Sequence, residues 1–150
     1  MSESVKAIYL DACALCRPFD DQTQMRVRLE TDAVQLVLSH VRAGELTMVI
    51  SPAHDAEIGA IDDDTEREDL LSTMQRIGQR PMFDLKQARE RAEELVRLGF
   101  GLADAAHLAF AEASQADFIT CDDRLIRQCR HIQLSVWCGT PVSFCDRENF

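Results

Sequence analysis

Short apolar runs typical of buried strands alternate along this chain with longer segments of helical periodicity. The runs that we interpret as strands are Val5 to Leu10, Leu46 to Ile50, Asp117 to Thr120 and Gln133 to Trp137. The segments that we interpret as helices are Gln24 to Ala43, Arg67 to Ile77, Lys86 to Leu98, Leu102 to Ser114 and Asp122 to Arg130. Because parallel strands need a crossover that a helix usually supplies, this alternation predicts an α/β fold with a mainly parallel sheet.

The connections between these segments carry signals of their own. Pro18 and the Asp20-Asp21 pair predict a loop after the first strand, whereas Ser51-Pro52 is typical of the start of a helix. We expect the acidic stretch after Ile58 to form a surface loop, and Pro141 to begin a tail. The length of 150 residues favours one domain covering the whole chain.

The net charge of −10 is concentrated in one segment. Between Asp55 and Asp69 there are eight acidic residues and one arginine, so this segment carries −7 and the remainder only −3. The balance argues against a protein that coats DNA through a broad basic surface. It is compatible with an enzyme that meets nucleic acid through a local basic patch and bound cations.

Compartment signals predict a cytoplasmic protein without a membrane segment. The opening MSESVKAIYL has no long apolar run or cleavage signature, and no run approaches the roughly 20 apolar residues of a membrane span. We therefore expect the cysteines to be free thiols. They are Cys13, Cys16, Cys121, Cys129, Cys138 and Cys145.

Four acids fall where the predicted sheet places chemistry. Asp11 ends the first strand, and Asp122 follows the Asp117 to Thr120 strand. Glu57 lies about one and a half turns into the helix after Ser51, and Asp104 lies in the first turn of another helix. Because ligands bind at the carboxyl ends of parallel strands, the four acids are candidates for one cluster. Such a cluster needs a cation, and oxygen ligands without histidine suit Mg²⁺ or Mn²⁺.

Each acid also has a simpler interpretation. Asp11 is in a position typical of a turn former or helix cap, and Asp104 suits the positive end of a helix dipole. Asp122 is a possible cap for the helix that follows it, and Glu57 is a possible solvated residue in an acidic segment.

Three strings resemble the PIN-domain family. The first acid lies in IYLDACALCRPFDD, which is similar to the opening of a bacterial subgroup with Arg-Pro-Phe-Asp-Asp. The second acid lies in SPAHDAEI, and the last two lie in GLADAAHLAFAEASQADFITCDDRLIR. The resemblance runs from Ile8 to Arg127.

The resemblance implies a three-layer α/β/α fold with strand order 3-2-1-4-5 and an Mg²⁺- or Mn²⁺-dependent ribonuclease. Many bacterial members are VapC-like toxins that a cognate antitoxin inhibits, and PIN toxins commonly form homodimers. The family's four acids correspond to Asp11, Glu57, Asp104 and Asp122. In-line attack by water then leaves a 5′-phosphate and a 3′-hydroxyl.

Further residues are candidates for supporting roles. Thr120 is a candidate for a bond to a carboxylate or a metal-bound water, and Asp123 is an alternative to Asp122. The candidates for contact with RNA phosphates are Arg17, Arg124 and Arg127. The chain departs from the family pattern at Ala12, where a hydroxyl or amide is common, and at Cys16, where the subgroup commonly has Asn.

Several rival interpretations stand beside the nuclease. The main one is a catalytically silent PIN-like module that binds RNA or protein. Cys13 and Cys16 have redox or zinc spacing, although Pro18 makes a thioredoxin-like context poor. A haloacid-dehalogenase phosphatase needs an acid where Cys13 stands. His107 follows Asp104 by one turn, and we expect it to lie on the helix surface.

Overall fold

The computed structural model describes residues 5–150 and contains one five-stranded parallel sheet with the order β3-β2-β1-β4-β5. The strands are β1 (Lys6–Leu10), β2 (Leu46–Val49), β3 (Gly78–Gln79), β4 (Asp117–Ile119) and β5 (Cys138–Gly139). Both the fold class and the strand order implied by the family resemblance are therefore confirmed.

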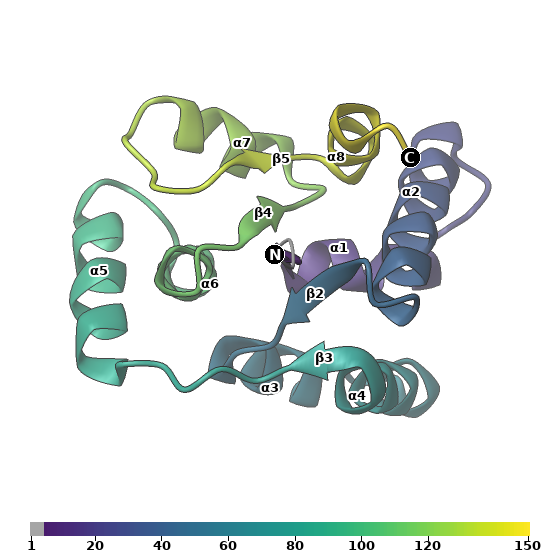
Figure 1. Cartoon of the computed structure of the whole chain (residues 1–150), viewed down its shortest axis with the longest axis horizontal. Helices are drawn as coiled ribbons and strands as arrows, with labels where there is room; N and C mark the ends of the chain where they lie inside the picture. Colours follow the sequence, from purple (N-terminus) through teal and green to yellow (C-terminus); the bar gives the residue numbers. More distant parts are fainter. Residues whose placement is uncertain (1–4) are drawn as a thin grey trace.

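Helices cover both faces of this sheet and make the second and third layers. They are α1 (Ala12–Cys16), α2 (Met25–Arg42), α3 (Pro52–Gly59), α4 (Asp64–Ile77), α5 (Leu85–Arg97), α6 (Leu102–Ala113), α7 (Asp123–Arg130) and α8 (Pro141–Glu148). A short 3-10 helix, η1 (Arg17–Phe19), follows α1. In Figure 1, α2 and α8 lie on one side of the sheet and α5 and α6 on the other. Within residues 5–150, none of these helices is both long enough and apolar enough to cross a membrane.

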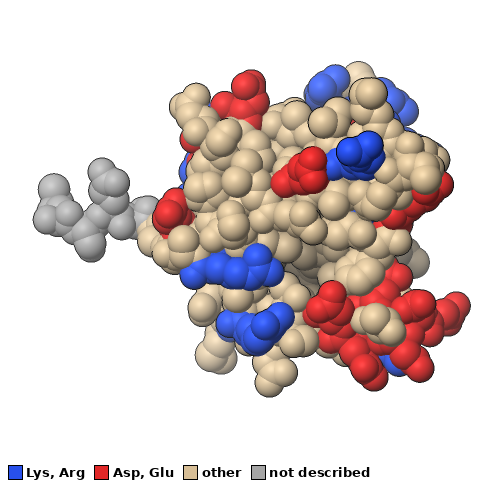
Figure 2. All heavy atoms as spheres, turned by 90° about the vertical axis from the view of Figure 1, so that its right-hand side faces the viewer, with Lys and Arg blue, Asp and Glu red and all other residues tan. Residues whose placement is uncertain are grey.

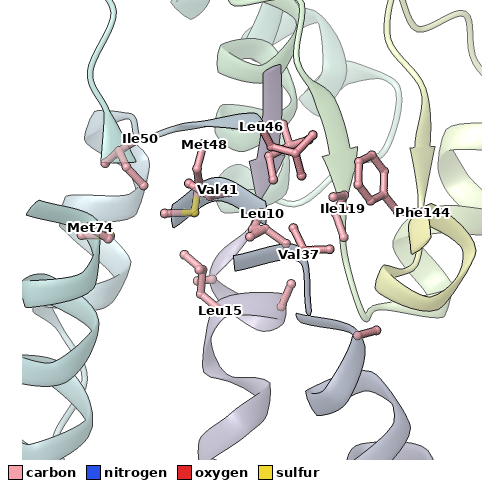
Figure 3. Close-up of a cluster of buried hydrophobic side chains, with 14 of the residues drawn as sticks. Leu10, Leu15, Val37, Val41, Leu46, Met48, Ile50, Met74, Ile119 and Phe144 are labelled. Carbon is pink, nitrogen blue, oxygen red and sulfur yellow. The ribbon is translucent and has the colours of Figure 1, made fainter. Parts of the chain in front are cut away.

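The central strand β1 contributes to two separate apolar cores. Ile8 and Leu10 belong to the cluster under α2, α4 and α8, whereas Tyr9 belongs to the cluster under α5, α6 and α7. Alternate side chains of a strand point to opposite faces, so a strand covered on both faces is apolar throughout. Figure 3 shows the first cluster, in which Leu10, Ile119 and Phe144 come from three different elements.

The structure corrects two predictions near the C-terminus. The last strand is Cys138–Gly139 instead of Gln133 to Trp137, because the pairing with β4 runs through the residues after Trp137. The predicted tail is the helix α8, which Thr140 caps by accepting a hydrogen bond from Ser143 N–H at 3.0 Å. Pro141 stands in the first turn, where it needs no hydrogen-bond partner for its nitrogen.

Two predicted loops are also partly helical. The segment after Asp11 forms α1 and η1, because the Asp11 side chain caps α1. The acidic stretch enters α4 at Asp64, since Asp63 caps that helix and acids in a first turn interact favourably with its dipole. Figure 2 shows acidic side chains gathered in one patch on the lower part of the face. The net charge is therefore largely segregated from the sheet.

Candidate active site

Asp11 ends β1 and is the most buried of the four acids, with 4% of its surface exposed. Its Oδ1 accepts a hydrogen bond from Ala14 N–H at 2.9 Å, and its own N–H donates to the Ile119 carbonyl at 3.1 Å. Burial raises the pKa of Asp11 to about 6, although hydrogen bonds from Thr120 and Ala14 oppose the shift. A carboxylate held here in charged form is therefore costly unless a cation compensates for it.

Asp104 and Asp122 come from later elements, the first turn of α6 and the N-terminal cap of α7. Asp104 is half-buried in the first turn of α6, and its pKa is raised by burial and then by the negative charges of Asp122 and Glu57. Asp122 is exposed and caps α7 by accepting hydrogen bonds from Arg124 N–H at 3.0 Å and Leu125 N–H at 3.2 Å. The charge of Asp104 thus interacts with two of its partner acids.

Thr120 connects the first acid to the last. Its hydroxyl oxygen accepts a hydrogen bond from Asp122 N–H at 3.1 Å, and its side chain also hydrogen-bonds to Asp11. Thr120 is fully buried at the end of β4. The pairing of β4 with β1 brings this hydroxyl to the edge of the sheet that carries Asp11. A supporting position for Thr120 agrees with this geometry.

Glu57 reaches the same edge from α3, and His107 binds it there. Glu57 Oε1 lies 2.8 Å from His107 Nε2, and this hydrogen bond lowers the pKa of Glu57. The prediction that His107 lies on a helix surface is wrong, because the residue is 1% exposed. Its burial is possible because both ring nitrogens have polar partners, the second being the Tyr9 hydroxyl at 2.6 Å.

The remaining candidates differ in their accessibility. Asp123 pairs with Arg26 at 2.8 Å, which favours Asp122 over Asp123 as the acid of the site. Arg17 is only 19% exposed and pairs with Asp20 at 3.0 Å and Glu30 at 3.3 Å.

Two arginines of α7 are freer than Arg17. Arg124 and Arg127 are exposed, and the positive charge of Arg124 lowers the pKa of Asp104. Arg124 is therefore close enough to Asp104 for its charge to influence that acid.

The cysteines near the site are free thiols, as predicted. The nearby Cys121 lowers the pKa of Cys13. Cys16 instead has a pKa raised to about 12 by burial and by the nearby Glu66. Cys13 and Cys16 therefore lie in different electrostatic environments.

The donor chemistry of the acids fits a hard divalent cation. Among residues 5–150, no three carboxylate, histidine or cysteine side chains lie close enough together to enclose a metal ion. Mg²⁺ needs no such enclosure, since it commonly takes one or two carboxylates and completes its shell with water and substrate phosphate. Burial is the main cause of the raised pKa values of Asp11 and Asp104, and a nearby cation would stabilise these carboxylates in their charged form.

Comparison with known proteins gives a family and a fold. The family model of the PIN domain matches residues 8–130. Among curated proteins, none matches the chain. Solved structures with a similar fold include VapBC2 from Rickettsia felis bound to a DNA fragment from their promoter, PAE2754 from Pyrobaculum aerophilum, and FitAcB from Neisseria gonorrhoeae.

These solved structures share the fold at low sequence identity. VapBC2 is 17% identical with a TM-score of 0.58, over 89% of this chain and 98% of that chain. PAE2754 is 16% identical with a TM-score of 0.52, over 95% of this chain and 88% of that chain. FitAcB is 17% identical with a TM-score of 0.50, over 90% of this chain and 98% of that chain.

Proposed function

This chain belongs to the PIN-domain family, whose members are generally nucleases, and from that premise we propose that it is an Mg²⁺- or Mn²⁺-dependent endoribonuclease. The observation that carries the proposal is geometric: Asp11 and Asp122 follow the paired strands β1 and β4, and Glu57 contacts His107, which lies one turn after Asp104 in α6. The pKa of Asp104 responds to Asp122 and Glu57, and the pKa of Asp11 responds in turn to Asp104. Four acids drawn from separate elements thus share one local field.

In this proposal the four acids have different roles. Asp11, Asp104 and Asp122 would hold the cation, directly or through the water in its shell, and Glu57 would complete the site or orient the attacking water. When bound, the cation supplies charge stabilisation for the phosphate and makes water a better nucleophile. Water attacks phosphorus in line, the bond from phosphorus to the 3′-oxygen breaks, and the products carry a 5′-phosphate and a 3′-hydroxyl.

The chain's other residues orient the acids and the substrate. The Thr120 hydroxyl holds Asp11 and Asp122 in a fixed relation, because it hydrogen-bonds to both residues. Arg124 contacts the RNA phosphate beside Asp104, and Arg127 extends this contact along the exposed face of α7. Arg17 contributes less, since its guanidinium is already paired with two carboxylates.

We also assign the chain to the VapC-like toxins, with an antitoxin protein as its inhibitor and a homodimer as its assembly. Exposed apolar side chains of α2 and α8 support a protein partner. Met25, Leu29 and Val142 line a hollow of about 470 Å³ between these two helices. Co-expression with the product of a neighbouring small gene and light scattering of the purified protein test the two assignments separately.

The decisive experiment compares RNA cleavage by the wild type and by Asp11→Asn. We expect Mg²⁺-dependent cleavage that a chelator abolishes, and no cleavage by the variant, whose circular dichroism matches the wild type. Undiminished cleavage by Asp11→Asn would remove the role assigned to this residue. RNA binding without cleavage by the wild type would instead favour the rival, a catalytically silent PIN-like module.

A further inference from the structure

A continuous chain of hydrogen bonds runs beneath the candidate site and ends on one of its acids. Ser51 Oγ lies 2.6 Å from Tyr9 Oη, and Tyr9 Oη lies 2.6 Å from His107 Nδ1. The second ring nitrogen, His107 Nε2, lies 2.8 Å from Glu57 Oε1. Ser51, Tyr9 and His107 are each almost fully buried, whereas the Glu57 side chain is 37% exposed. This series of hydrogen bonds therefore connects the interior of the protein to its surface at Glu57.

The chemistry of these groups fixes the direction of the last bond. A Glu57 carboxylate only accepts hydrogen bonds, so His107 Nε2 carries the hydrogen that bridges them. This holds whether the ring is neutral or protonated. The tautomer with its only proton on Nδ1 would set the Nε2 lone pair against Oε1. The contact with Tyr9 then fixes the plane of the His107 ring, because it holds Nδ1, on the opposite side of the ring from Nε2.

Neighbouring groups restrict the ring further. Tyr9 packs between Phe118 and His54, with ring centroids at 5.8 and 4.5 Å. His54 Nε2 donates to the Leu10 carbonyl at 2.6 Å, and burial lowers the pKa of His54 to about 4. His54 is thus a neutral ring in a fixed position, and it packs beside His107 with ring centroids 5.1 Å apart. These contacts leave His107 in one orientation.

We propose that His107 is a positioning residue, which holds the Glu57 carboxylate on the acid cluster while Tyr9 fixes the His107 ring. This inference rests on the proposed nuclease function. One oxygen of Glu57 is occupied by His107, and within residues 5–150 the other accepts no hydrogen bond. That second oxygen is available to the cation or to its water. Because His107 follows Asp104 by one turn in α6, a single helix supplies one acid and orients another.

Two substitutions at position 107 separate positioning from packing. In His107→Gln, an amide N–H can occupy the place of Nε2 and still donate to Glu57. In His107→Asn, the amide is one methylene shorter and meets Tyr9 but not Glu57. Both variants remove the imidazole ring, so a purely structural role predicts similar losses in both. A positioning role predicts that His107→Gln retains the Mn²⁺ binding and RNA cleavage that His107→Asn loses.

The readouts are Mn²⁺ binding, measured from the electron paramagnetic resonance of the free ion, and the kinetics of RNA cleavage. We expect His107→Asn to weaken Mn²⁺ binding and lower kcat by about 10–100-fold, the range typical of groups that orient metal ligands. The KM for RNA should not change, and His107→Gln should recover most of the loss. In a Glu57→Ala background, His107→Asn should have no further effect on Mn²⁺ binding.

Equal losses of Mn²⁺ binding in the Asn and Gln variants would overturn the proposal, as would an Asn effect that persists in the Glu57→Ala background. If His107→Asn does not fold, Tyr9→Phe tests the same link, because it keeps the packed ring and removes only the hydroxyl. We expect that variant to weaken Mn²⁺ binding as well, and unchanged binding would contradict the proposal. Failure of the wild type to cleave RNA would defeat the proposed function alone, since Mn²⁺ binding is measured without RNA.

Discussion

At the scale of single residues, Asp11 contributes to the candidate site at a cost in stability. Its pKa is about 6 in the folded chain, against an ordinary value of 3.8, because the carboxyl is buried. Between these values the folded state binds more protons than the unfolded state. Stability is therefore lost as the pH rises from about 4 through 6, and the whole cost is present at pH 7.

We therefore predict that Asp11→Asn is more stable than the wild type at pH 7 without divalent ions, by about 1–3 kcal/mol. Asparagine is also a good helix cap, so the bond to Ala14 can persist. Urea denaturation at pH 7 and pH 4 measures the difference, which should shrink at pH 4 and on addition of Mg²⁺ at pH 7. Asp123→Asn, at an exposed and paired position, is the control. An equal gap at both pH values would contradict the assigned cause.

The same residues show what a sequence can predict of a site. Asp11 and Asp122 were predictable because each follows a strand at the carboxyl edge of a parallel sheet. The buried position of His107 was not, because Tyr9 and Glu57 are 98 and 50 positions away in the chain. The spacing from Asp104 to His107 indicated a shared helix face, but not which face is covered. Assignment of the four acids as one metal site stays a prediction.

At the scale of elements, the long periodic helices and the apolar strands β1, β2 and β4 were predictable, but the two-residue strands were not. Strands β3 and β5 have two residues each, too few for any alternation, and their pairing depends on neighbouring strands. Helix α8 was mistaken for a tail, although a threonine cap followed by proline is a helix start. Pro141 was expected to begin a tail because a single sequence does not show what the residues after it pack against.

Phe144 explains why α8 forms, and it supplies a prediction. The residue is fully buried in the core under α2, with the Trp137 ring 5.9 Å away between centroids. Phe144→Ala should lower the free energy of unfolding by about 3–5 kcal/mol, because it leaves a cavity. Val142→Ala, on the same helix but 47% exposed, should change it by no more than about 0.5 kcal/mol. Equal effects in urea denaturation would show that α8 is not docked through Phe144.

At the scale of the whole molecule, an acidic protein that binds RNA needs its charges segregated. The acidic patch lies over α4 (Figure 2), whereas the exposed Arg124 of α7 lies near Asp104. Under the proposed function, RNA binding depends on few cationic contacts in spite of the net charge of −10.

Replacing both Arg124 and Arg127 by alanine should weaken binding of single-stranded RNA and reduce the salt dependence of log K by about 1.4. The measurement is fluorescence anisotropy at several salt concentrations, in the Asp11→Asn background so that RNA stays intact. Lys86→Ala with Arg89→Ala, on the exposed side of α5, removes the same charge elsewhere and is the control. An unchanged slope for the Arg124 and Arg127 double variant would exclude these arginines from the RNA contact.

The parallel pairing of β1 with β4 has a consequence for synthesis of the protein. The pairing joins Ile8–Leu10 to Asp117–Ile119, residues separated by more than a hundred positions. A ribosome therefore adds Asp11 more than a hundred residues before it adds Asp122. The growing polypeptide lacks the full set of four acids until translation has entered its final quarter. Under the proposed function, the translation machinery that makes the protein is therefore not exposed to a finished nuclease during most of elongation.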